Sequence, residues 1–264
     1  MRLLRPIRLF GHYIAFNLRA GMEYRTSFFV QIFGMIANNT GFAIFWMLLY
    51  QRIGSAIRGY AFSDVMFLWA LASAGFGMSV VFLGNSGMIS RIIYRGELDV
   101  YLLQPKPVLP NLLASRMVAS GWGDLAYGIL LFFISQHVTL GGLALFLLFA
   151  VLMCLVFTAL KVIYHSLTFF FGNAEDFAVM ANEVTLSMTL YPGSIFEGPV
   201  KIALFTLFPA GVIAYIPVSL FRSFDPARLL LVIAADAAFV LVAFLVFARG
   251  LRFYESGSRM GIRL

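Results

Sequence analysis

The sequence predicts an all-α membrane protein with six transmembrane helices, and its composition is the first observation behind this prediction. Hydrophobic residues make up 61% of the 264-residue chain and charged residues only 12%, about half the usual charged share of a soluble domain. So few charges cannot cover the surface of a water-soluble fold. No polar stretch is long enough for a second, soluble domain, so we expect residues 28–264 to form a single transmembrane domain.

Long apolar runs are the second observation, because a helix must cover about 30 Å to cross the hydrocarbon of a bilayer. The fifth of these runs is disturbed at Pro192, since proline breaks a helix. The expected spans are about residues 28–50, 62–86, 111–135, 143–170, 177–191 and 228–248.

Residues 1–27 combine arginines with a modest apolar stripe, and they precede the first long apolar run. Leu3, Ile7 and Ile14 recur at helical spacing between the basic residues. A basic amphipathic helix lies in the membrane interface rather than crossing it. We therefore expect an N-terminal interfacial helix, with a disordered basic tail as the alternative.

The basic residues are distributed unevenly between the two sides of the predicted spans. If the N-terminus is cytoplasmic, thirteen lie on the inner side, five on the outer side, and Lys161 within a span. The inner set is Arg2, Arg5, Arg8, Arg19, Arg25, Arg91, Arg95, Lys106, Arg116, Arg249, Arg252, Arg259 and Arg263, and the outer set is Arg52, Arg58, Lys201, Arg222 and Arg228. The positive-inside rule then places both termini in the cytoplasm. The net charge of +7 thus indicates topology and contacts with lipid headgroups, not nucleic-acid binding.

The outer segment between Tyr191 and Phe224 is apolar, but prolines divide it into pieces too short to span a membrane. The prolines are Pro192, Pro199, Pro209 and Pro217. Because irregular backbone is not tolerated against lipid, we expect short outer or re-entrant helices packed against protein. The alternative is that residues 200–221 form an extra span, which would place the basic C-terminus outside.

Residues 96–110, GELDVYLLQPKPVLP, interrupt the apolar runs on the predicted cytoplasmic side. Gly96 suits the end of one helix, and Glu97 and Asp99 suit the first turn of another. The prolines that follow give a stiff, extended exit.

One face of this short helix is expected to be apolar, because Leu98, Tyr101 and Leu102 have the spacing i, i+3, i+4. An exposed apolar face on a rigid turn is typical of a docking surface. The alternative is a helix that lies on the membrane without a protein partner.

This run resembles the cytoplasmic loop of ABC transporter permeases of the type-2 family, and in particular its branch of short six-span chains. Three further features agree with that family in their order along the chain: the basic N-terminal segment, the outer stretch YPGSIFEGP…FPAGVIAYIP, and the tail GLRFYESGSRMG. The resemblance implies a permease subunit of an ATP-driven exporter in the bacterial cytoplasmic (inner) membrane. It also implies two cytoplasmic ABC ATPase subunits and a second permease, identical or related, and it leaves the substrate open.

By residue matching, Gly96 to Leu103 would be the coupling helix that binds an ATPase, with Glu97 and Asp99 as its acidic contacts. A phosphate-binding loop G-x-x-x-x-G-K-[ST] needs a lysine after glycine, whereas the lysines here follow proline, leucine and valine. We therefore expect no catalytic residues and no cofactor in this chain, with ATP and Mg²⁺ bound by the partner ATPase.

Six polar or ionisable residues fall within or near the predicted spans, where such groups are costly and face protein or water. They are Asn38, Asn39, Asp124, Lys161, Glu183 and Asp236. Our functional interpretation is the lining of a translocation path or a permease–permease interface. The alternative is a set of internally paired structural groups.

Asp124 also ends the tetrapeptide Gly121-Trp122-Gly123-Asp124, the GxGD pattern of intramembrane aspartyl proteases. That chemistry needs a second carboxylate sharing a proton, and the usual Tyr-Asp partner dipeptide does not occur in the sequence. The glycines therefore indicate close helix packing instead.

Two further residues, Glu197 and Lys201, are four apart in the outer segment and could pair on a helix as an outer gate. A pairing that only holds this helix at the headgroups is the alternative. The histidines show no metal-binding spacing, so no metal site is expected. Two other functions remain open, a membrane enzyme acting on a lipid and a scaffold without transport. The enzyme would need three or more carboxylates or histidines near one membrane face, and we find no such cluster in the sequence.

Overall fold

The computed structural model describes residues 4–135, 138–206, 209 and 211–255, and the regular structure over these residues is helical without a named strand. This confirms the predicted all-α membrane fold. The main helices are α1 (Leu4–Gly21), α2 (Arg25–Ile53), α3 (Phe62–Phe82), α4 (Ile89–Tyr94), α5 (Asp99–Leu102), α6 (Val108–Ala114), α7 (Gly121–Ile134), α8 (Leu140–Ser166), α9 (Thr168–Phe171), α10 (Glu175–Thr189), α11 (Gly198–Thr206), α12 (Ile216–Arg222) and α13 (Pro226–Gly250).

Four helical stretches of the described chain are long and apolar enough to cross a membrane, and a fifth, Gly121–Ile134, is shorter. The four are Arg8–Ile53, Phe62–Phe82, Leu140–Phe171 and Pro226–Phe253. They contain the predicted first, fourth and sixth spans, and the helix of the second span ends at Phe82 instead of near residue 86. The number of six crossings stays a prediction. Arg2, Arg259 and Arg263, which the topology prediction uses, lie outside the described residues, as does the C-terminal motif from residue 256.

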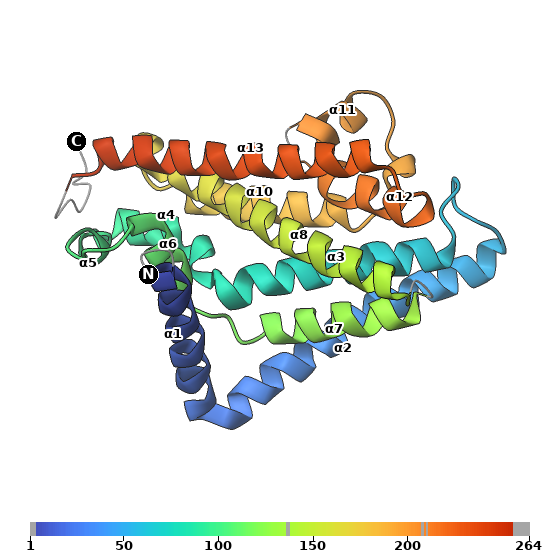
Figure 1. Cartoon of the computed structure of the whole chain (residues 1–264), viewed down its shortest axis with the longest axis horizontal. Helices are drawn as coiled ribbons and strands as arrows, with labels where there is room; N and C mark the ends of the chain where they lie inside the picture. Colours follow the sequence, from blue (N-terminus) through green and yellow to red (C-terminus); the bar gives the residue numbers. More distant parts are fainter. Residues whose placement is uncertain (1–3, 136–137, 207–208, 210, 256–264) are drawn as a thin grey trace.

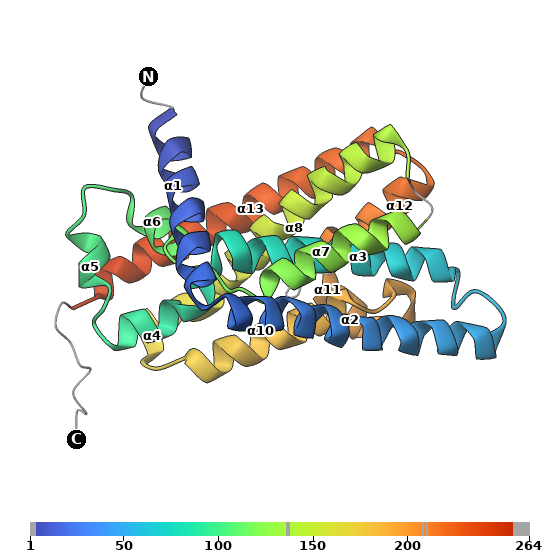
Figure 2. The same ribbon diagram turned by 90° about the horizontal axis from the view of Figure 1, so that it is seen from below.

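The bundle has two distinct ends (Figure 1). Helices α4, α5 and α6 gather at one end, together with the start of α1 and the end of α13, whereas α12 and the turn after α2 lie at the other. We call these the α5 end and the α12 end. Helix α1 lies roughly perpendicular to α3 and α13 in both views (Figures 1 and 2), as an interfacial helix would.

The third predicted span, residues 111–135, is not one continuous helix, because α6 and α7 are separated by residues 115–120. Polar partners stabilise this break. The amide of Val118 donates to the carbonyl of Val80, 3.0 Å away, and the Asn85 side chain donates to the carbonyl of Leu112 at 3.1 Å. Backbone groups that a helix would have paired are thereby satisfied.

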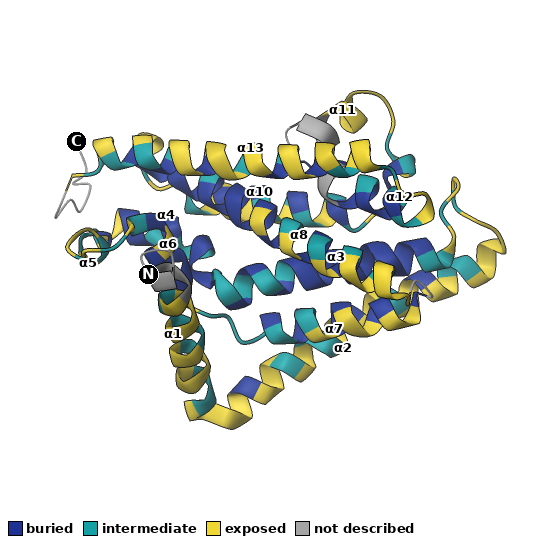
Figure 3. Ribbon diagram, in the orientation of Figure 1, coloured by how far each residue is buried: buried dark blue, intermediate teal, exposed yellow. Residues whose placement is uncertain are grey.

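Helix α3 is the centre of the bundle, and its buried surface contrasts with the exposed outer faces of α2 and α13 (Figure 3). It packs most extensively against α7 and α8. Glycines permit the close approach to α7, because a Cβ atom on Gly128 would lie 2.5 Å from the Ala74 nitrogen and one on Gly77 would lie 2.5 Å from the Leu125 nitrogen. The predicted packing role of Gly121 and Gly123 is confirmed, because a Cβ atom on Gly121 would lie 3.1 Å from the Gly77 oxygen and one on Gly123 would lie 2.5 Å from the Ile32 oxygen.

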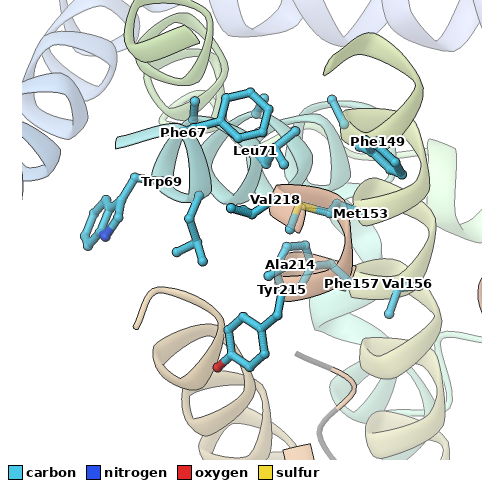
Figure 4. Close-up of a cluster of buried hydrophobic side chains, with 14 of the residues drawn as sticks. Phe67, Trp69, Leu71, Phe149, Met153, Val156, Phe157, Ala214, Tyr215 and Val218 are labelled. Atoms are coloured by element: carbon cyan, nitrogen blue, oxygen red, sulfur yellow. The ribbon is translucent and has the colours of Figure 1, made fainter. Parts of the chain in front are cut away.

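The outer segment is divided into short pieces, as its prolines predict, with α11 and α12 on either side of a turn at Pro209 and a π-helical turn at Gly211–Tyr215. The second piece is packed against protein. Val218 of α12 lies in the core beside Met153 of α8 (Figure 4), and the rings of Phe67 and Phe221 are 4.0 Å apart. Burial of this kind removes the segment from lipid.

Candidate functional site

The turn between α4 and α5 begins at Gly96, whose φ of +73° is readily adopted only by glycine. Its amide donates to the carbonyl of Ile93 at 3.1 Å, and the Glu97 amide donates to the carbonyl of Ile92 at 2.9 Å. These bonds close the end of α4 and redirect the chain into α5.

The apolar face of α5 differs from the one that the spacing predicts. Leu98 is fully buried, and the Tyr101 hydroxyl lies 3.0 Å from the Ser115 hydroxyl. Both residues face the protein, because Leu98 fills a cluster at the α5 end together with Ile89, Ile93, Leu109, Leu112 and Phe247. The expectation that Leu98 and Tyr101 are exposed on one face with Leu102 is therefore wrong, whereas their role in coupling stays a prediction.

The exposed apolar residues of this turn are Val100, Leu102 and Leu103, which are 61%, 42% and 86% exposed. Glu97 is exposed beside them, and Asp99 is partly buried. Of the six predicted coupling residues, Glu97 and Leu102 thus lie on the outer surface, while Leu98 and Tyr101 anchor the turn.

Side chains from α1 and α10 attach this segment to the bundle. Asn17 of α1 donates to the Ala114 carbonyl at 3.0 Å, and the Tyr13 hydroxyl donates to the Asn111 amide oxygen. Arg91 of α4 forms an ion pair with Glu175 at the start of α10, with Nη2 and Oε1 2.5 Å apart.

The stretch that follows α13 supplies a third attachment through Tyr254. Its hydroxyl lies beside the carboxylate of Asp99 and the backbone amides of Leu98 and Asp99, and a Cβ built on Gly96 would be 3.9 Å from it. Burial of the hydroxyl, together with the neighbouring carboxylate, raises the pKa of Tyr254 to about 12. The segment from α4 to α6 is therefore in contact with α1, with α10 and with the stretch that follows α13.

A second feature is a cavity of about 360 Å³ between α2, α3, α7 and α10. It brings together four of the six residues predicted within the membrane, namely Asn38, Asn39, Asp124 and Glu183. The Asn39 side-chain amide donates to Asp124 Oδ1 at 2.7 Å. The Tyr127 hydroxyl donates to the carbonyl of Asn39 at 3.1 Å, which fixes the position of this pair.

Lys161 and Asp236 do not line this cavity. The Lys161 amino group donates to the Ser79 hydroxyl at 3.1 Å and lies 4.5 Å from the centroid of the Phe76 ring. Asp236 is buried in α13. Both residues lie within long apolar helices, Lys161 in α8 and Asp236 in α13, but their side chains occupy other sectors of the bundle.

A further cavity of about 500 Å³ adjoins the first, because both are lined by Asn38, Phe42, Trp69, Ser187 and Leu190. We call the two together the α2–α10 groove. Sequence reasoning missed its serines and aromatic residues, since Ser73, Ser187 and Trp69 resemble ordinary residues of an apolar span. The only feature of the sequence that points to these residues is their position one to two helical turns from another polar residue.

At the α12 end, the predicted pairing of Glu197 with Lys201 does not form. Glu197 precedes α11, which begins at Gly198, so the two residues do not share one helix. Glu197 instead forms an ion pair with Arg58 of the turn after α2. Lys201 is exposed.

A stronger ion pair at this end joins Arg222 of α12 to Asp64 of α3. The guanidinium donates from Nε to Oδ1 at 3.0 Å and from Nη2 to Oδ2 at 2.5 Å. It also donates to the Gly59 carbonyl at 2.8 Å. The hydrogen bonds to Asp64 raise the pKa of Arg222 above its ordinary value. The Arg58–Glu197 pair and the Arg222–Gly59 hydrogen bond fasten the turn after α2 to the outer segment, and the Arg222–Asp64 pair fastens α12 to α3.

Comparison with known proteins adds one finding to this geometry. The family model described as ABC-2 family transporter protein matches residues 33–258, which include the groove, the turn at α5 and the outer segment. No curated protein matches the chain, and no solved structure does.

Proposed function

Because the chain belongs to the ABC-2 family of transporter proteins, we propose that it is the permease of an ATP-driven exporter coupled through the turn at residues 96–103. The family and the apolar helices make it a multi-pass integral membrane protein and the permease component of an ABC transporter. Such permeases associate with ABC ATPase components. The proposal adds two ATPase subunits, a second permease identical or related to this chain, and export from a bacterial cytoplasm through the inner membrane.

The observation that carries the proposal is the combination of anchored and exposed residues at the turn. Val100, Leu102 and Leu103 leave an apolar surface uncovered, while Leu98 fills the cluster beneath it. An exposed apolar surface on an otherwise anchored element suits a protein partner. In our proposal the turn lies in the cytoplasm with both termini, and Glu97 and Asp99 add acidic contacts to the ATPase.

The transport step needs no bond chemistry in this chain. ATP and Mg²⁺ would be bound by the ATPase, whose closure would press on the exposed face of the turn. The buried Leu98 and the Arg91–Glu175 ion pair would pass that displacement to the helices around it. Binding that differs between two arrangements of the bundle is sufficient to drive the change.

We assign the translocation path to the α2–α10 groove, which Asn38, Asn39, Asp124 and Glu183 line. Polar groups within spans usually mark such paths. A second permease would cover the open side of the groove. We assign Lys161 and Asp236 structural roles, and we assign the outer closure to Glu197 with Arg58 as its partner, Lys201 being its exposed neighbour.

The test is co-purification of the ATPase with full-length permease variants. Leu103→Asp places a charge on a side chain that is 86% exposed, so it should remove the docking surface without disturbing the core. Leu140→Asp is the matched control, because Leu140 is 87% exposed and is the first residue of α8, which begins at the α12 end (Figure 1). We expect Leu103→Asp to recover at least about tenfold less ATPase, and Leu140→Asp to recover the wild-type amount. Equal recovery with both variants would remove the docking role.

A further inference from the structure

The walls of the α2–α10 groove carry negative charge and aromatic surface. Asp124 and Glu183 are its two carboxylates, and none of the described residues that line either cavity is basic. Phe42, Trp46 and Trp69 contribute aromatic rings. A groove of this composition selects its ligand by charge as well as by apolar area.

The carboxylate of Asp124 is held with one oxygen unpaired. The residue is only 6% exposed, and its Oδ1 accepts the hydrogen bond from Asn39 at 2.7 Å. Oδ2 has no hydrogen-bond partner among the described residues. A buried acceptor without a partner is costly, and the side chain lines the cavity.

Nearby basic groups do not compensate this carboxylate directly. The Lys161 amino group is within electrostatic range of Asp124 and Glu183, but its hydrogen bond goes to the Ser79 hydroxyl at 3.1 Å. No ion pair joins Lys161 to either carboxylate within the described part of the chain. The unpaired oxygen is buried in the wall of the groove, so a cation in the groove would reach it after a small movement of the lining side chains.

The aromatic rings lie where they can cover the apolar body of such a ligand. The rings of Phe42 and Trp69 are 5.2 Å apart, and those of Trp46 and Tyr191 are 5.9 Å apart. The indole N–H of Trp69 already donates to the Leu190 carbonyl at 3.0 Å, so its polar edge is occupied and it contributes ring surface where it lines the groove. Aromatic faces attract cations.

We propose that the α2–α10 groove binds amphiphilic cations, with the positive charge against Asp124 and Glu183 and the apolar body against Phe42, Trp46 and Trp69. The inference rests on the proposed function, because it names the substrate class of the same path. It excludes anionic substrates, since two carboxylates without a lining basic residue repel them.

The experiment compares two ions of the same shape and opposite charge, tetraphenylphosphonium and tetraphenylborate. Binding to the full-length chain in lipid nanodiscs is measured by equilibrium dialysis, and partition into empty nanodiscs is subtracted. We expect tetraphenylphosphonium to bind at least about tenfold more tightly than tetraphenylborate. Equal binding of the two ions, or no binding of the cation, overturns the proposal.

Two variants locate the site. Asp124→Asn removes the charge but keeps an oxygen that accepts from Asn39, and we expect it to weaken cation binding at least about tenfold. Glu183→Gln changes an exposed side chain of α10 and should weaken binding severalfold without affecting folding. Glu97→Gln, a carboxylate on the α5 turn, should bind as the wild type does. Wild-type affinity in both Asp124→Asn and Glu183→Gln overturns the proposal.

The outcome is separable from the test of the proposed function. Binding is measured without the ATPase, whereas ATPase recovery is measured without the cation. A chain that recovers its ATPase but does not prefer the cation would overturn only the substrate class. A chain that prefers the cation but never recovers an ATPase would overturn only the coupling proposal.

Discussion

Gly128 of α7 lies where no side chain can fit against α3. A Cβ atom there would be 2.5 Å from the Ala74 nitrogen and 2.7 Å from the Ala70 oxygen. Both are backbone atoms of a helix, so they cannot rotate away as a flexible side chain could. The substitution Gly128→Ala must therefore push α7 away from α3, the most extensive helix pair of the bundle.

The expected cost follows from two opposing effects. Overpacking of this kind destabilises a protein by about 1–3 kcal/mol. Alanine regains up to about 1 kcal/mol over glycine through its higher helix propensity. Both clashing atoms belong to the backbone, which places the steric term at about 2–3 kcal/mol, so the net loss should be roughly 1–2 kcal/mol.

Thermal unfolding of the detergent-solubilised permease, followed by tryptophan fluorescence, measures this loss. Gly34→Ala is the matched control, since a Cβ on Gly34 of α2 meets no atom within 4 Å. We expect Gly128→Ala to lower the Tm by roughly 2–8 °C and Gly34→Ala to leave it unchanged or slightly raised. A Tm for Gly128→Ala equal to that of the control would refute the argument for glycine-dependent packing.

Two further predictions concern the ends of the bundle. Arg222→Ala leaves Asp64, which is 8% exposed, without its bidentate partner, so it should cost about 1–3 kcal/mol in chemical unfolding. Arg228→Ala breaks an exposed ion pair and should cost about 0–1 kcal/mol; equal costs would contradict this contrast. Because the folded-state pKa of Tyr254 is raised to about 12 from an ordinary value of about 10, its contribution to stability is complete below pH 10 and is lost as the pH rises through 12. The Tm of the wild type should therefore fall more steeply than that of Tyr254→Phe between pH 10 and 12, and parallel curves would contradict the prediction.

The long helices could be predicted because their apolar runs are set by the thickness of the bilayer, not by neighbouring residues. Helices α2, α3, α8 and α13 lie close to the predicted ranges for this reason. The break in the third span could not be predicted in the same way. It depends on Asn85 and Val80, which lie far from residues 115–120 in the sequence and are brought to them only by the fold.

The orientation of α5 shows a second limit of prediction from the sequence. Helical spacing correctly placed Leu98 and Tyr101 near one another, but a helix of four residues has too few contacts to determine which side faces the protein. The cluster at the α5 end determined it, because a leucine gains more free energy when it fills a core than when it contacts water. The exposed surface consequently shifted to Val100 and Leu103.

The polar residues within the predicted spans could be identified by type, but the direction of their side chains could not be predicted. Costly groups must face protein or water, and a sequence does not show which sector of a bundle each one occupies. Asn39 and Asp124 meet because α2 packs against α7. Lys161 instead faces Ser79 of α3, so charge alone was not sufficient to place it in the groove.

Helix α10 connects the two regions to which we assign coupling and transport. Its first residue, Glu175, is held by Arg91 of the segment that leads into the α5 turn. Glu183 lies eight residues further along the same helix, about 12 Å away at 1.5 Å per residue, and lines the groove. A helix transmits an axial displacement over this distance with little loss, because its backbone hydrogen bonds run parallel to the axis. Force on the turn would thus move one wall of the groove relative to Asp124, which is held by Asn39 on the opposite wall, and would change the distance between the two carboxylates that the proposed cation contacts.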